Sequence, residues 1–128
     1  MSEEWQIITY QEVDGKKPVD EFLTSSLTPV EYKQFQFRLS LISTKGLALI
    51  IERSDILDKI KTEDNLYELR LPNTRNNPRI FLCALTGKRL VLLHAFKKKG
   101  RKTPHNEIYI AAKRRDLVVA KEDKTDEQ

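Results

Sequence analysis

Residues 90–104 read Leu-Val-Leu-Leu-His-Ala-Phe-Lys-Lys-Lys-Gly-Arg-Lys-Thr-Pro, and this stretch carries more information about the fold than any other. An apolar run long enough for a buried strand ends in His94, and five cations follow within six positions. Thr103-Pro104 then signals the start of a helix. We therefore expect the cations at the rim of a folded core, where a rigid basic surface suits a polyanion such as RNA.

The composition is that of an ordinary globular chain. With 128 residues, of which 39% are hydrophobic and 33% charged, it can bury a core and does not resemble a disordered protein. We expect one domain over residues 1–120 and a polar, frayed tail at 121–128. The apolar runs are too short for a bilayer and the acidic N-terminus lacks a signal-peptide pattern, so a cytoplasmic protein is expected. Cys83 is the only cysteine and lies in an apolar run, which predicts a core position and excludes an intrachain disulfide.

The net charge of +4 is unevenly distributed. Residues 97–115 hold eight Lys or Arg and one Glu, giving +7, so the rest of the chain sums to −3. A basic segment on a mildly acidic body indicates one face for an anionic partner. Within this segment we expect Lys113, Arg114 and Arg115 on a solvated or partner-facing helix surface. Glu107 is expected to be structural, because a carboxylate in the first turn of a helix favours the helix dipole.

Hydrophobic spacing and turn residues predict an α+β domain with a mainly antiparallel sheet and the element order β-α-α-β-β-β-α. The expected elements are a strand at 5–13, a helix opening at Pro18, a helix capped by Thr28 and ended by Gly46, strands at 66–71, 79–85 and 89–96, and a helix from Thr103 to about Val119. Thr28-Pro29-Val30-Glu31 has the pattern of a capping box. Core positions on that helix are predicted from their spacing at Tyr32, Phe35, Leu39 and Ile42. Residues 47–61 give no assignment.

The common catalytic motifs are missing. There is no Gly-rich phosphate loop, HExxH or nucleophile elbow, and two histidines with one cysteine offer no convincing metal cluster, so neither metal nor cofactor is expected. RNA can be cut without a metal when the 2′-hydroxyl attacks the adjacent phosphorus and the 5′-oxygen leaves. The protein must then orient the nucleotide, offset charge on the phosphoryl oxygens and move protons.

Cations on strands and strand ends fit these tasks, because arginine pairs with two phosphate oxygens at once and stays protonated. The catalytic candidates are Arg70, Arg79, His94, Lys97 and Lys98, and the RNA-binding candidates are Lys99, Arg101 and Lys102. Structural alternatives remain: Arg70 pairing with Glu68, Arg79 facing solvent at a strand end, and His94 hydrogen-bonded in the core. The alternative function is a non-catalytic nucleic-acid-binding regulatory subunit.

Several of these residues also form a family pattern. Leu66-Tyr67-Glu68-Leu69-Arg70, Arg79-Ile80, the run from Val91 to Lys98, and Lys102-Thr103-Pro104 with Glu107-Ile108 and Ala111 stand in order over about residues 62–115. This arrangement resembles the phage-derived HigB-like toxins of the RelE/ParE superfamily. The chain departs from the pattern in having Pro78 before Arg79 and no tyrosine directly after it; Tyr109 is the nearest candidate for a C-terminal acid or base.

The resemblance implies a RelE-like fold and the toxin of a type II toxin–antitoxin pair. Such a toxin is a ribosome-dependent, metal-independent mRNA endonuclease (an mRNA interferase). Its implied partners are mRNA, the ribosome and a helix-turn-helix antitoxin of the HigA type, with operator DNA reached only through the antitoxin. By the same resemblance Arg70 and Arg79 match strand arginines that face RNA, Lys97 and Lys98 match basic residues after the last strand, and His94 matches the usual histidine there.

Overall fold

The computed structural model describes residues 4–71, 77–101 and 104–126, with the side chains of the last helix described as far as Glu122. Five strands form one sheet in the order β1-β5-β4-β3-β2. Their bounds are β1 (Gln6–Thr9), β2 (Leu57–Lys59), β3 (Tyr67–Arg70), β4 (Pro78–Leu85) and β5 (Arg89–Lys97). Only the β1–β5 pair is parallel, and the other three pairings are antiparallel. The predicted α+β class with a mainly antiparallel sheet is confirmed.

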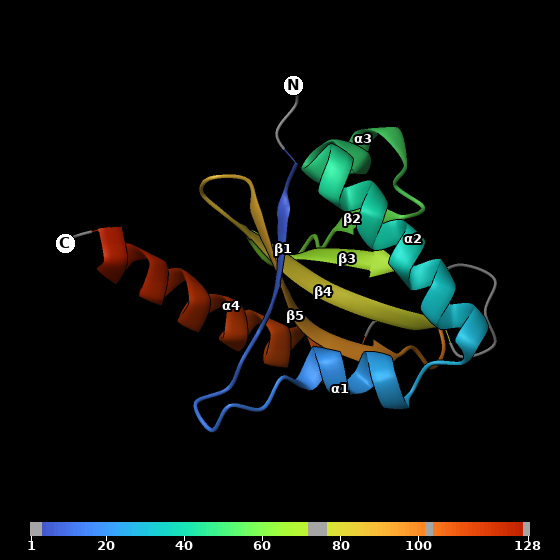
Figure 1. Cartoon of the computed structure of the whole chain (residues 1–128). Coiled ribbons are helices and arrows are strands. Elements are labelled where there is room, and N and C mark those ends of the chain that lie inside the picture. Colours follow the sequence, from blue (N-terminus) through green and yellow to red (C-terminus); the bar gives the residue numbers. More distant parts are fainter. Residues whose placement is uncertain (1–3, 72–76, 102–103, 127–128) are drawn as a thin grey trace.

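Helices lie on both sides of this sheet (Figure 1). They are α1 (Pro18–Ser25), α2 (Pro29–Lys45), the short 3₁₀ helix η1 (Gly46–Ala48), α3 (Leu49–Glu52) and α4 (His105–Asp126). Figure 1 shows α2 and α3 on the right of the sheet, while α4 extends to the left, away from them. None of the described helices is both long and apolar enough to cross a bilayer.

Local signals in the sequence set both ends of α2. The predicted capping box is confirmed: Glu31 N donates to Thr28 Oγ1 at 3.1 Å, and Thr28 N donates to Glu31 Oε1 at 2.9 Å. Gly46 ends the helix at a φ of 59°, and its N–H donates to the carbonyl of Ile42. A Cβ at Gly46 would lie 2.1 Å from the indole of Trp5, so any residue other than glycine would require the backbone or Trp5 to move.

Side chains alternate along the strands, and each face of the sheet has its own apolar cluster. We call them the α2 face and the α4 face. On the α2 face, the strand residues Leu57, Leu69, Ile80, Leu82, Leu90 and Leu92 pack with Val19, Phe35, Ile42 and Leu49 from the helices. On the α4 face, Leu66, Phe81, Cys83, Val91, Leu93 and Phe96 pack against Ala111 of α4. The core position predicted for Cys83 is confirmed, and burial raises the pKa of its thiol to about 12.

Two expectations on local structure are corrected, and the unassigned stretch receives an assignment. The first strand spans only Gln6–Thr9 rather than 5–13, because Asp14 and Gly15 already form a turn closed by the Gly15 N–H donating to Glu12 O. The unassigned stretch 47–61 contains η1, α3 and β2. Tyr32 is 38% exposed and does not belong to the core, unlike Phe35 and Ile42, which are buried.

The last helix is longer than expected. It continues to Asp126 rather than ending near Val119, so most of the predicted frayed tail is helical. Contacts with the β4–β5 hairpin stabilise this extension: Thr86 Oγ1 donates to Glu122 Oε1 at 2.7 Å, and Arg89 forms an ion pair with the same carboxylate. Thr103, the predicted cap, lies outside the described residues.

Candidate functional site

Two neighbouring cross-strand rows of side chains mark the α4 face. The pairing register aligns Asp58, Glu68, Phe81 and His94, which we call the carboxylate row. The next row aligns Arg70, Arg79 and Phe96, which we call the arginine row. A β-bulge at Leu93 keeps His94 on this face, because Phe81 pairs with His94 while Leu82 pairs with Leu92. Residues from four strands thus meet on one patch.

Arg70 is held from three sides. Its Nε donates to Glu68 Oε1 at 2.8 Å, its Nη2 lies 3.5 Å from Asp58 Oδ2, and its Nη1 donates to the carbonyl of Ser54 at 3.4 Å. The side chain remains 35% exposed, so part of the guanidinium faces solvent. The pairing of Arg70 with Glu68, which was the structural alternative for Arg70, therefore occurs. Arg79 lies directly beside this pair, opposite Arg70.

Arg79 lies directly opposite Arg70, and the two like charges would repel each other. Arg79 is half-buried, and its Nε has no hydrogen-bond partner among the described residues. Burial lowers the pKa of Arg79, the charge of Glu68 raises it, and the charge of Arg70 lowers it. Two fork-shaped donors that stay protonated and face the same patch can grip the oxygens of one phosphate.

His94 is enclosed by residues of α4. Its Nε2 contacts Glu107 Oε2, its Nδ1 lies 3.3 Å from Arg114 Nη1, and its ring stacks on Phe96 with centroids 5.8 Å apart. A neutral ring with the proton on Nε2 satisfies both neighbours, because Nε2 donates to the carboxylate and Nδ1 accepts from the guanidinium. Burial lowers the pKa of His94, Glu107 opposes this shift, and Arg114 adds to it. These contacts match the structural alternative of a hydrogen-bonded core histidine and suit an orienting role.

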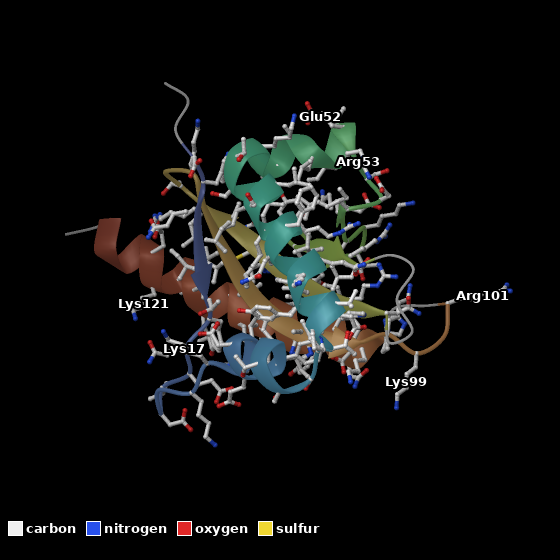
Figure 2. The ribbon with its side chains drawn as sticks, turned by 45° about the vertical axis from the view of Figure 1, so that its right-hand side comes forward. Lys17, Glu52, Arg53, Lys99, Arg101 and Lys121 are labelled. Carbon is white, nitrogen blue, oxygen red and sulfur yellow. The ribbon has the colours of Figure 1, made fainter. Side chains whose placement is uncertain are left out.

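The lysines at the end of β5 and directly after it are divided between the two faces. Lys97 pairs with Pro78, so strand alternation turns it to the side opposite Arg79. Lys98, the next residue, is half-buried, follows Phe96 by two positions and donates its N–H to Asn77 O at 2.9 Å. Lys99 and Arg101 are exposed and project from the loop on the right of Figure 2. Lys102 lies outside the described residues.

The expectation for the α4 cations is corrected. Lys113 is exposed, but the side chains of Arg114 and Arg115 are only 17% and 13% exposed. Arg114 donates to Leu93 O at 2.9 Å and Glu12 Oε1 at 3.1 Å. Arg115 donates to the carbonyl of Asp64 and pairs with Glu63 and Asp116, so both arginines act as structural links. Arg114 and Arg115 are therefore not part of an exposed basic surface.

Sequence reasoning missed the acidic half of the patch. Asp58 lay in the unassigned stretch, and Glu68 was considered only as a partner for Arg70. Alternation within β3 was the available signal, because it places Glu68 on the same side as Arg70. No group of three His, Cys, Asp or Glu in the described parts of the chain is placed to hold a metal ion.

A groove of about 920 Å³ lies elsewhere on the molecule. It is lined by β1, the turn that follows it and the C-terminal half of α4, including Tyr10, Val13, Leu117 and Val118. None of the residues of the arginine row lines this groove. The candidate site is thus the partly exposed patch around Arg70 and Arg79 rather than an enclosed cavity.

Comparison with known proteins gives the family. Residues 24–116 match the family model described as Phage derived protein Gp49-like (DUF891). The structure is similar to that of a free-state arginine-to-alanine double mutant of the Escherichia coli toxin RelE, with a TM-score of 0.56 and 13% sequence identity over 88% of this chain and 97% of that chain. A search of curated proteins finds no match. Because the matched segment exceeds half of its length, the chain belongs to the Gp49-like phage-derived family, a RelE/ParE-type toxin family, and it has the RelE fold.

Proposed function

We propose that the protein is a HigB-type toxin of a type II toxin–antitoxin pair and that it cuts mRNA on the ribosome without a metal. The observation that carries this proposal is the direct cross-strand pairing of Arg70 with Arg79 on a partly exposed patch. Family membership and the RelE fold support the toxin assignment. The loop cations Lys99 and Arg101 support contact with a polyanion, because they are exposed on the loop that follows β5, the strand that carries Phe96 of the arginine row.

In the proposed reaction the RNA 2′-hydroxyl attacks the adjacent phosphorus, and the bond from phosphorus to the 5′-oxygen breaks. Arg79 and Arg70 bind the non-bridging oxygens and offset the negative charge that grows on them. Arg70 reaches the phosphate by exchanging its 3.5 Å contact with Asp58 for a phosphate oxygen. Lys98 adds positive charge and is the candidate proton carrier nearest this side of the sheet, while His94 orients the end of β5.

The proposed partner is a helix-turn-helix antitoxin of the HigA type, and the proposed setting is the cytoplasm, where ribosomes translate. Operator DNA would be reached only through the antitoxin. The positive charge of the loop after β5, where Lys99 and Arg101 are exposed, favours an acidic antitoxin segment. A short helix-turn-helix gene beside the toxin gene, whose product co-purifies with this protein, is the expected finding.

The test is cleavage by purified protein added to translating ribosomes. The wild type should cut mRNA and leave 2′,3′-cyclic phosphate and 5′-hydroxyl ends. Arg79→Ala should reduce the cleavage rate about 10²- to 10³-fold, as expected for loss of a group that stabilises transition-state charge.

Lys17→Ala is the matched control for loss of a cation. Lys17 is exposed on the opposite side of Figure 2 from Lys99 and Arg101, so its removal should leave the rate unchanged. If wild-type protein binds RNA in a salt-dependent manner but leaves mRNA intact, the protein is instead a non-catalytic nucleic-acid-binding regulatory subunit.

A further inference from the structure

We propose that Glu68 is a positioning residue that holds Arg70 and Arg79 in place for the phosphate, a role that rests on the proposed function. Glu68 contacts neither RNA nor the reacting atoms in this scheme. It acts through the two arginines, one on its own strand and one on the neighbouring strand.

The first observation is burial. Glu68 is 2% exposed and is one of only two charged residues buried to this extent among the described residues. Its Oε1 accepts from Arg70 Nε at 2.8 Å, while its Oε2 is buried and has no hydrogen-bond partner in the described part of the chain. A buried carboxylate is costly unless paired, so its presence at the end of the sheet calls for a reason beyond packing.

The second observation is its place between the arginines. Glu68 pairs with Phe81 and Arg70 pairs with Arg79, so Glu68 and Arg79 are diagonal neighbours on the same face. The buried Nε of Arg79 is likewise without a partner among the described residues. One negative charge thus lies beside two positive ones, which reduces the repulsion between arginines placed directly opposite each other.

This carboxylate works against simple anion binding. A negative charge beside Arg70 and Arg79 weakens the attraction of the patch for phosphate, so a site built only for affinity would omit it. Its benefit is geometric, since a fixed guanidinium offers its remaining N–H groups in one direction. Removal of the charge should therefore slow the chemical step and leave binding unchanged or tighter.

The test compares Glu68→Gln with Glu63→Gln in the ribosome assay. The glutamine keeps the shape of Glu68 and loses its charge. Glu63 is the matched control, because its carboxylate also pairs with an arginine, Arg115, away from the arginine row. We expect Glu68→Gln to lower kcat about 10- to 100-fold with an equal or lower KM, and Glu63→Gln to leave both constants unchanged.

A second variant separates positioning from folding. Glu68→Asp keeps the charge on a shorter side chain and should recover part of the lost kcat, with thermal unfolding followed for all three variants. If the wild type cleaves mRNA and the kcat of Glu68→Gln stays within twofold of the wild-type value, the role of Glu68 is overturned while the proposed function stands. A rise in the KM of Glu68→Gln without loss of kcat would also overturn that role. Wild-type protein that leaves mRNA whole overturns the proposed function itself.

Discussion

On the α2 face, the ends of β3 and β4 carry Leu69 and Ile80, which are fully buried, whereas on the α4 face the adjacent positions carry Arg70 and Arg79. Each arginine is thus one residue away from a core leucine or isoleucine on the same strand. The pleat of the strand separates the two environments without any change in the backbone. One short pair of strands therefore both stabilises the fold and presents the charged patch, so neighbouring substitutions should have separable effects.

The largest expected effect on stability is on the α2 face. Ile80→Ala should lower the free energy of unfolding by about 3 kcal/mol, because it leaves a cavity in the apolar cluster of the α2 face. Arg79→Ala should lower it by about 1 kcal/mol or less, since Glu68 keeps its bond to Arg70. Urea denaturation of the two variants measures this difference. Equal destabilisation by both would show that the two faces are not energetically distinct.

A second substitution tests the α2 side away from the strands. Gly46→Ala should lower the free energy of unfolding by about 2–3 kcal/mol, because the new Cβ overlaps the Trp5 indole and the backbone conformation favours glycine. The measurement is thermal unfolding, with tryptophan fluorescence reporting displacement of Trp5, the only tryptophan. Gly100→Ala is the control: its φ is also positive, but its Cβ would meet nothing within 4 Å, so a smaller loss is expected.

The third prediction concerns pH on the α4 face. The pKa of His94 in the folded protein lies below its ordinary value of 6.5, mainly because of burial. The unfolded chain therefore takes up the proton first as pH falls, so this contribution to stability is complete above pH 6.5 and decreases below it. Thermal unfolding between pH 7 and 5 should show a slope that His94→Gln reduces. An unchanged slope in the variant would mean that His94 does not titrate in this range.

The smallest expected effect distinguishes two adjacent lysines. Strand alternation puts Lys97 on the α2 face. If the alternation continues by one residue, where Lys98 N donates to Asn77 O, Lys98 lies towards the arginine row. Lys98→Ala should therefore weaken RNA binding about threefold and reduce the salt dependence by about 0.7 in slope, while Lys97→Ala should do less. Binding of a short single-stranded RNA at several salt concentrations measures both quantities. A larger effect of Lys97→Ala would reverse this assignment of faces.

Much of the fold could be predicted because its signals are local. Each of three signals involves residues only a few positions apart: the capping box at Thr28, the glycine that ends α2, and the alternation in β3. β2 could not be predicted, since it has three residues, two of them charged, and exists only through its pairing with β3. The extension of α4 was missed for a similar reason: its contact with Thr86 and Arg89 comes from a distant hairpin.

At the candidate site, the sequence predicted which arginines lie on the patch better than it predicted their acidic partners and their burial. Arg70 and Arg79 could be selected from strand position, and their cross-strand pairing in the structure supports that choice. Of the acidic partners, Glu68 was foreseen for Arg70 from its place on the same strand, whereas Asp58 could not be assigned because it becomes a neighbour only through the register of β2 and β3. The burial of Arg114 and Arg115 depends on Glu12 and Glu63, which lie far away in the sequence.

The parallel pairing of β1 with β5 has a consequence for the order in which the sheet assembles. The first strand has no neighbour in the sheet until the last strand has been made, and Phe96 at the end of that last strand completes the arginine row. Pairing between segments so far apart in the chain forms slowly, so the sheet is completed late in folding. The order of strands thus makes β1 the last strand to find its neighbour in the sheet, although it is the first to be made.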